Sequence, residues 1–207
     1  MMINHDPEFV ITLQRVIEFI GTFAFALSGI RLAASKHYDW LGGFVCGIAV
    51  AIGGGTIRDV MLGVRPFWML SPIYMICTLF AQCVVIVCHH YLRRLDTTWF
   101  LFDTLGLALF NIAGIQKTLE CGFPFWVAII MGCITGAAGG VIRDVLLNEE
   151  PVIFRKEIYA MACVVGGLTY WLLSWLQVSL YITVIATFAI VCAIQFLAVR
   201  YHISLPK

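Results

Sequence analysis

Gly53-Gly54-Gly55-Thr56-Ile57-Arg58-Asp59 places three glycines and a charged pair inside a long apolar stretch. A similar run, Gly139-Gly140-Val141-Ile142-Arg143-Asp144, follows 85 residues later. The same offset relates further identical residues: Gly21 and Gly106, Phe25 and Phe110, Gly29 and Gly114, Gly47 and Gly132, Pro66 and Pro151, and Tyr74 and Tyr159. Between residues 18–66 and 103–151, 13 of 49 aligned positions are identical. Such self-similarity at a fixed period indicates an internal duplication.

The composition is that of a membrane protein. Apolar residues make up 61% of the 207 positions, charged residues only 12%, and the mean hydropathy is +0.95. A soluble domain carries about 25% charged residues. The net charge is +1 and there is no dense basic run, so a nucleic-acid partner is not expected. The eight cysteines form no CxxC pair and His89-His90 stands alone, so neither a disulfide nor a metal site is expected.

Seven apolar segments are long enough to cross a bilayer, which needs about 20 residues per helix. We therefore expect an all-α membrane protein with a single domain over residues 1–207. The expected spans are 12–34, 41–62, 69–91, 98–116, 123–147, 158–177 and 179–200. The first repeat covers about 12–91, the second about 98–177, and the seventh helix about 179–200. Because each repeat holds three spans, an odd number, the second repeat should enter the membrane inverted.

Lysine and arginine residues predict the orientation, since they concentrate in cytoplasmic loops. One side of the expected topology carries Arg31, Lys36, Arg93, Arg94, Arg155, Lys156, Arg200 and Lys207, and the other carries Arg15, Arg65 and Lys117. This asymmetry places the N-terminus outside the cell and the C-terminus in the cytoplasm. The expected localisation is a cell membrane, which the resemblance described below implies to be the bacterial inner membrane.

The glycine runs have two interpretations. Glycine costs a helix about 1 kcal/mol relative to alanine, so Gly53, Gly54 and Gly55 should break or kink the second span. Gly139 and Gly140 should do the same to the fifth, and both breaks should face a wet cavity, because unwound backbone at membrane depth must be satisfied there. The other interpretation is close helix packing, which small residues permit.

The intramembrane charges need partners, since a charged residue at a helix centre costs about 2.5–3.5 kcal/mol on insertion scales. Neighbouring residues on a helix point about 100° apart, so Arg58 and Asp59 should not pair easily with each other. We predict the pairs Glu18–Arg58 and Asp103–Arg143, which leaves Asp59 and Asp144 to face cations. The alternative is that all six form a structural ion-pair network.

Two further polar residues are candidates for the pathway. Thr56 is expected to form an interhelical hydrogen bond. Lys117, at the end of the fourth span, either reaches the interface or acts as a charge gate.

The chain resembles the bacterial branch of the trimeric intracellular cation channels, a family also labelled glycine transporter domain. The resemblance rests on the two glycine-Arg-Asp motifs, on the seven-span plan, and on Glu18-Phe19-Ile20-Gly21-Thr22 with Ala26-Leu27-Ser28-Gly29. It implies a homotrimer with one pore per subunit, lined by kinked second and fifth spans and passing monovalent cations, chiefly potassium. The pore charges it implies are Arg58, Asp59, Arg143 and Asp144.

The expected function is therefore a monovalent cation channel. A secondary transporter of glycine or another small amino acid is the alternative, because inverted repeats suit alternating access and Arg58 suits a substrate carboxylate. An enzyme is not expected, since no GxSxG, HExxH or P-loop motif occurs. No cofactor is expected beyond potassium in the pore, and the expected partners are the bilayer and further copies of the chain.

Overall fold

The computed structural model describes residues 7–88, 98–155 and 158–201, and every element within these ranges is helical. His89-His90 and the basic residues Arg93, Arg94, Lys156 and Lys207 lie outside the described residues. The first repeat contains α1 (Pro7–Ser35), α2 (Trp40–Met61), the 3-10 helix η1 (Phe67–Met69) and α3 (Ile73–Val87). The second contains α5 (Thr98–Glu120), α6 (Phe125–Leu146), α7 (Val152–Arg155) and α8 (Ile158–Trp175), and α9 (Leu180–Arg200) follows.

Five of these helices have the length and composition to cross a membrane: Thr12–Ser35, Trp40–Met61, Trp99–Glu120, Phe125–Leu146 and Leu180–Arg200. The helices at the two remaining predicted spans are apolar but shorter, Ile73–Val87 and Tyr159–Trp175. α3 starts late because Pro72 lacks an N–H and suits the start of a helix, so the chain before it forms η1 and a turn instead.

The turns of the two repeats have the same backbone geometry. His37 and Gly122 both have a positive φ, 63° and 83°, and so do Gly63 and Asn148, at 70° and 52°. Each pair is separated by 85 residues. At each turn the chain leaves its helix through the same two backbone hydrogen bonds, for example Tyr38 N to Ala33 O. Such left-handed caps end a helix sharply and satisfy its last carbonyls.

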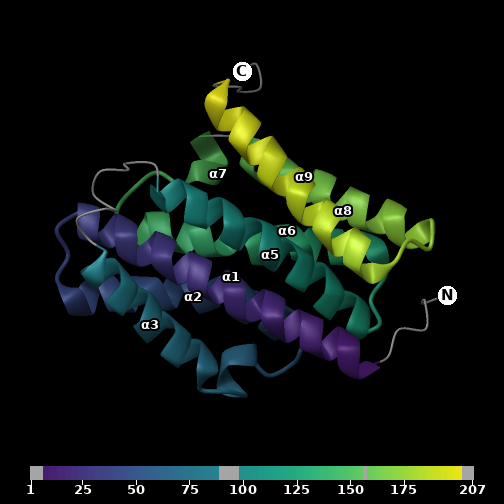
Figure 1. The fold of residues 1–207 in the computed structure, drawn as a ribbon, viewed down its shortest axis with the longest axis horizontal. Coiled ribbons are helices and arrows are strands. Elements are labelled where there is room, and N and C mark those ends of the chain that lie inside the picture. Colours follow the sequence, from purple (N-terminus) through teal and green to yellow (C-terminus); the bar gives the residue numbers. More distant parts are fainter. Residues whose placement is uncertain (1–6, 89–97, 156–157, 202–207) are drawn as a thin grey trace.

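α1 and α5 run side by side through the middle of the molecule, with α2 and α3 on one flank and α8 and α9 on the other (Figure 1). The Phe25 and Phe110 rings stack with centroids 5.3 Å apart and an interplanar angle of 9°. A Cβ on Gly21 would lie 3.1 Å from the Phe110 ring, and one on Gly106 would strike the Phe25 ring. Both contacts are reciprocal under the 85-residue offset, as contacts across a two-fold axis are.

α2 and α6 cross at a second reciprocal contact. A Cβ on Gly54 would strike the backbone oxygen of Thr135, and one on Gly139 would lie 2.8 Å from the backbone oxygen of Val50. Positions 54 and 139, and 50 and 135, are equivalent in the repeat. The two backbones therefore touch directly, which leaves no room for an ion between them at this level.

The predicted interruption of these helices is wrong. α2 is continuous through Gly53, Gly54 and Gly55, and α6 is continuous through Gly139 and Gly140. The glycines permit close packing, because the backbone hydrogen bonds of each helix continue while the missing side chain lets its partner approach. A kink within a continuous helix stays a prediction.

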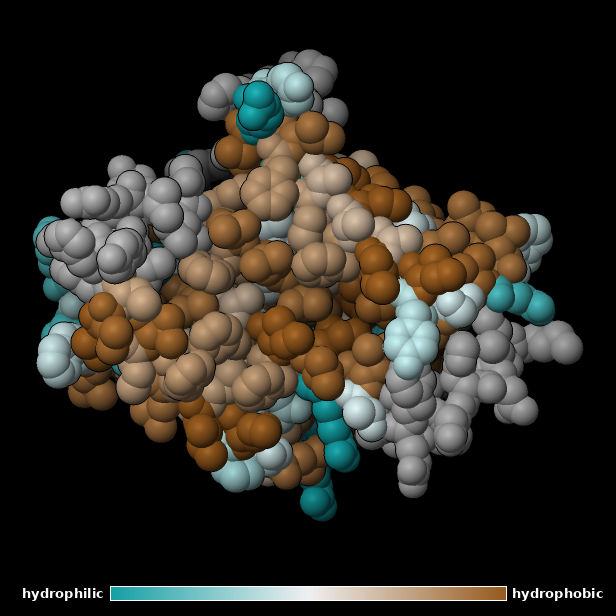
Figure 2. Space-filling view, viewed as in Figure 1, coloured by the Kyte–Doolittle hydropathy of each residue, from teal (hydrophilic) through white to brown (hydrophobic). Residues whose placement is uncertain are grey.

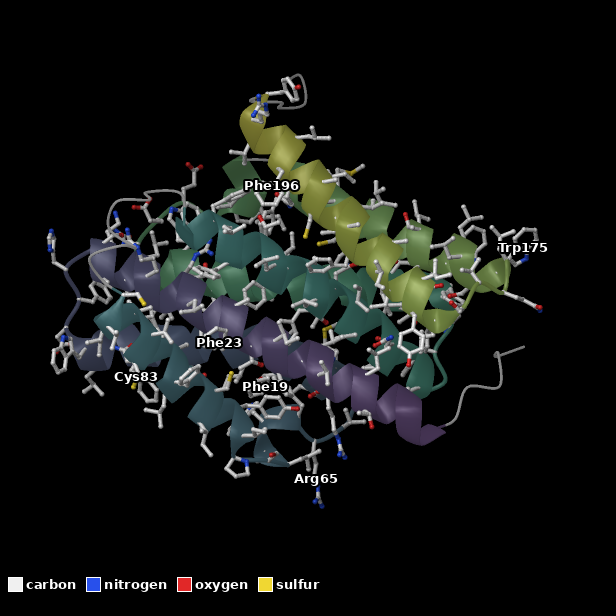
Figure 3. All side chains as sticks on the ribbon, viewed as in Figure 1. Phe19, Phe23, Arg65, Cys83, Trp175 and Phe196 are labelled. Carbon is white, nitrogen blue, oxygen red and sulfur yellow. The ribbon has the colours of Figure 1, made fainter. Side chains whose placement is uncertain are left out.

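The surface agrees with a lipid environment. The face in Figure 2 is mostly hydrophobic, and its hydrophilic residues gather toward the margins. On α1, Phe23 stacks on Phe80 of α3 with ring centroids 5.7 Å apart, and Phe19 lies on the same flank (Figure 3). Arg65, in the turn after α2, points away from the bundle (Figure 3).

Two glycines of α2 should respond oppositely to alanine. Gly43→Ala should raise stability by about 1 kcal/mol, because the nearest atom to its new Cβ is 3.8 Å away and alanine favours the helix. Gly54→Ala should lower stability by about 1–3 kcal/mol, since the Thr135 carbonyl cannot rotate away. Thermal unfolding of the two purified variants in one detergent checks this. Equal midpoints would contradict the assigned role of the crossing.

Candidate functional site

The first buried cluster joins α1, α2 and α3. Arg58 Nη2 donates to Glu18 Oε1 at 3.1 Å, and Arg58 Nε donates to Asp59 Oδ1 at 2.7 Å. The Tyr74 hydroxyl donates to Glu18 Oε2 at 3.2 Å. The second oxygen of Asp59 accepts the backbone N–H of Phe67 at 2.7 Å. Arg58 has no exposed surface, so its charge is balanced entirely by these neighbours.

The second buried cluster joins α5, α6 and α8 in the same way. Arg143 Nη1 pairs with Asp103, and Arg143 Nε donates to Asp144 Oδ1 at 2.9 Å. The Tyr159 hydroxyl donates to Asp103 Oδ2 at 2.9 Å. Asp144 Oδ2 accepts the backbone N–H of Val152 at 2.9 Å. Every member lies 85 residues after its equivalent in the first cluster, so the duplication reproduces a complete network.

Both predicted ion pairs between helices, Glu18–Arg58 and Asp103–Arg143, are present. The expectation that an arginine does not pair with the aspartate after it is wrong in both clusters. The expectation considered only the directions of the Cα–Cβ bonds. The arginine stem is long enough to fold back, so that its Nε reaches the neighbouring carboxylate.

Asp59 and Asp144 are therefore engaged on both oxygens, one by an arginine and one by a backbone N–H. Each N–H belongs to the start of the next short helix, η1 or α7. A carboxylate there satisfies an orphan donor and a positive helix end. Neither these N–H donors nor the two tyrosine hydroxyls were predicted from the sequence. The repeat does match Pro66 with Pro151, just before each N–H donor, and Tyr74 with Tyr159.

An aromatic ring covers each guanidinium. Arg58 Cζ lies 5.6 Å from the centroid of Phe67, and Arg143 Cζ lies 4.9 Å from that of Trp99. A cation over an aromatic face is worth about 0.5–2 kcal/mol, more when it is desolvated. The rings differ between repeats, since Phe67 follows α2 whereas Trp99 begins α5.

Two other predicted pathway residues stand apart from these clusters. The Thr56 hydroxyl donates to Ile52 O at 2.7 Å and accepts from Trp68 Nε1 at 3.0 Å. Lys117 Nζ lies 3.5 Å from Glu120 Oε2, with a third of each side chain exposed. Among the described residues, no group of three histidine, cysteine, aspartate or glutamate side chains is placed to hold a metal ion.

The formal charge of each cluster is negative. In each, two carboxylates surround one guanidinium, and the tyrosine is neutral. Arg58 follows Gly54 by one helical turn, and Arg143 follows Gly139 likewise. Because α2 and α6 cross antiparallel at these glycines, the clusters lie on opposite sides of the crossing.

Comparison with known proteins shows which family this chain resembles. The sequence model of the family described as Glycine transporter matches residues 15–90 and 100–175, two stretches with the same 85-residue offset at both ends. The inner membrane protein YadS of Escherichia coli K12 is 37% identical over 194 residues, 92% of this chain and 93% of the relative. A membrane protein of Vibrio cholerae is 36% identical over 94% of this chain and 82% of its own length.

Solved structures with the same fold identify the family further. The TRIC trimeric intracellular cation channel orthologue from Rhodobacter sphaeroides superposes with a TM-score of 0.85 at 28% identity, covering 93% of this chain and all of that one. The chain belongs to the trimeric intracellular cation channel family. A second TRIC cation channel, solved to explain conductance, has a TM-score of 0.81 at 32% identity and covers 93% of this chain and 96% of its own. This TRIC-family chain is a transmembrane helical protein of the bacterial type.

Removing one carboxylate from a buried cluster should be costly. Asp144→Ala leaves Arg143 short of a partner and the Val152 N–H unsatisfied, which should lower stability by about 3–5 kcal/mol. Lys117→Gln removes a half-exposed charge and should change stability by less than about 1 kcal/mol. Size-exclusion profiles and thermal midpoints measure both variants. A stable, monodisperse Asp144→Ala protein would show that the cluster is not needed for the fold.

Proposed function

We propose that this protein is a passive channel for monovalent cations, chiefly potassium, and not an enzyme. The observation that carries the proposal is the excess of carboxylates in each buried cluster beside the α2–α6 crossing, two against one guanidinium, which gives a formal charge of −1 when both are ionised. Arginines along a pore would by themselves repel cations. Here each guanidinium is outnumbered by carboxylates, so the local field favours a cation. The family resemblance supports the proposal, since the solved relatives are named cation channels.

The proposed pathway runs between α2 and α6 within one subunit, and a homotrimer would hold three such pathways. Reciprocal contacts at Phe25–Phe110 and at Gly54–Gly139 support inverted repeats about an axis in the membrane plane. On this view one cluster faces each side of the membrane. The lysine and arginine distribution supports an N-terminus outside and a C-terminus in the cytoplasm of the inner membrane.

Transport of glycine or another small amino acid is the second candidate, because the family model that matches both repeats is described as Glycine transporter. In that mechanism Arg58 would bind the substrate carboxylate. Arg58 already bonds the carboxylates of Glu18 and Asp59, and only its buried Nη1 has no hydrogen-bond partner. A substrate carboxylate would therefore have to bind at a buried nitrogen beside two like charges, which favours the channel.

Planar bilayers containing the purified protein under asymmetric potassium chloride test the proposal. We expect discrete current steps and a reversal potential close to that of potassium. Glu18→Gln keeps the shape and one acceptor oxygen for Arg58, and its amide N–H can donate to the Tyr74 hydroxyl, but it brings the first cluster to a formal charge of zero. It should move the reversal potential toward zero by roughly half, because the field at that cluster no longer favours cations.

Arg200→Gln, in the exposed last turn of α9, is the control and should leave the reversal potential near that of potassium. Silent bilayers together with saturable uptake of labelled glycine into liposomes would replace the channel by the transporter. An unaltered reversal potential in Glu18→Gln would separate the first cluster from the ion pathway.

A further inference from the structure

Three side-chain bonds cross from the first repeat to α6 and the residues after it. Arg143 Nη1 donates to Ser28 Oγ on α1 at 2.8 Å. The Tyr38 hydroxyl, in the turn between α1 and α2, donates to Leu146 O at 3.2 Å. Lys36 pairs with Glu149 just beyond α6. We call these three the cross-repeat bonds, and together they attach the C-terminal half of α6 to the α1–α2 hairpin.

The repeat offset identifies the residues that would attach α2 in the same way. At the equivalent positions of the second repeat, alanine replaces the serine, phenylalanine the tyrosine and cysteine the lysine, and in the first repeat valine stands where the second has the glutamate. The equivalents are Ala113 for Ser28, Phe123 for Tyr38, Cys121 for Lys36 and Val64 for Glu149. A methyl group, an aromatic ring without a hydroxyl and an isopropyl group cannot form these bonds. The chemistry of all three equivalent positions therefore leaves α2 without them.

One consequence is visible at the first cluster. Each guanidinium has one buried nitrogen without a hydrogen-bond partner, Nη1 in Arg58 and Nη2 in Arg143. The difference lies at Nη1, which in Arg143 bonds both Asp103 and Ser28. Glu18 takes the Nη2 edge of Arg58, and Ala113, fully buried, offers no acceptor side chain to its Nη1. Arg143 is therefore bonded to a helix of the other repeat, and Arg58 lacks the equivalent bond.

The glycine content of the two helices also favours greater mobility in α2 than in α6. Gly53, Gly54 and Gly55 are consecutive, directly before the turn that carries Arg58. In α6 the equivalent of Gly53 is Ala138. The nearest glycine before the Gly139-Gly140 pair is Gly136, so α6 has no run of three. Glycine lowers helix stability relative to alanine, so the segment of α2 next to its cluster bends more readily.

We propose that the two halves of the pathway are unequal: the C-terminal half of α6 is fixed to the α1–α2 hairpin by the cross-repeat bonds, and the C-terminal half of α2 moves when the pathway opens. Direct backbone contact at Gly54 and Thr135 means that one helix must withdraw before an ion passes. Ser28 and Tyr38 are then positioning residues that decide which helix stays. The role in opening rests on the proposed channel function, whereas the difference in mobility does not.

Hydrogen–deuterium exchange of the wild-type protein in lipid nanodiscs tests the mobility directly. Backbone amides of residues 55–66 should exchange about fivefold or more faster than those of the equivalent residues 140–151, the factor expected from about one net hydrogen bond. Equal exchange in the two segments, or faster exchange in residues 140–151, would overturn the proposal.

Exchanging the side chains between repeats tests the cause. Ala113→Ser with Phe123→Tyr gives α2 two of the missing groups, so exchange in residues 55–66 should slow and the open probability in bilayers should fall about threefold or more. Ser28→Ala with Tyr38→Phe should speed exchange in residues 140–151. Ala108→Ser, the same change at another buried alanine of α5, is the control and should alter neither segment.

The two proposals fail separately. If neither double variant changes exchange in its own segment, the cross-repeat bonds do not determine which helix moves, and the inference is wrong even when currents are normal. If the wild-type protein is silent in bilayers but residues 55–66 exchange faster, the channel function fails while the unequal halves remain.

Discussion

Two arginines without exposed surface, in an otherwise apolar bundle, constrain everything around them. An uncompensated buried charge costs several kcal/mol, so each guanidinium requires carboxylates from two helices. In the first repeat, Arg58 thereby fixes α1 to α2 through Glu18. Asp59 fixes α2 to the start of η1, and Tyr74 brings α3 to Glu18. One charge thus determines how four elements of the repeat pack, and the second repeat repeats the solution around Arg143.

The glycines allow close packing between helices, although their helix propensity suggests that they interrupt the helices. Side chains at Gly54 and Gly139 would push α2 and α6 apart. Side chains at Gly21 and Gly106 would collide with the stacked rings of Phe110 and Phe25. Close contact at the crossing keeps the two charge clusters on opposite sides of a narrow barrier. The fold therefore combines a close glycine contact between α2 and α6 with one buried charge cluster on each side of it.

The sequence revealed the duplication, the charged residues of both clusters and the ion pairs between helices, because identity at a fixed offset and rare intramembrane charges are strong signals. It did not reveal the roles of Asp59 and Asp144, since a backbone N–H eight residues away leaves no trace in residue types. It also favoured broken helices at Gly53–Gly55. Helix propensity alone cannot distinguish a glycine that breaks a helix from one that allows a neighbouring helix to pack closely. The late start of α3 at Ile73 was missed, since hydropathy continues through Pro72, whereas α8 begins at 158 as predicted and ends two residues early.

Duplication supplies symmetry, and a pathway with two identical halves has no reason to open on one side before the other. Function then depends on positions where the copies have diverged. About half of the differences between residues 18–66 and 103–151 exchange one apolar side chain for another, and the rest change a polar or charged group. Ser28 and Ala113 differ in a single oxygen atom, yet that oxygen decides whether the buried guanidinium bonds a helix of the other repeat. In low-dielectric surroundings such a difference carries more weight than many apolar exchanges, because there is no water to compensate for it. Polar divergence between equivalent positions is therefore the feature of a duplicated membrane protein that points most directly to its moving part.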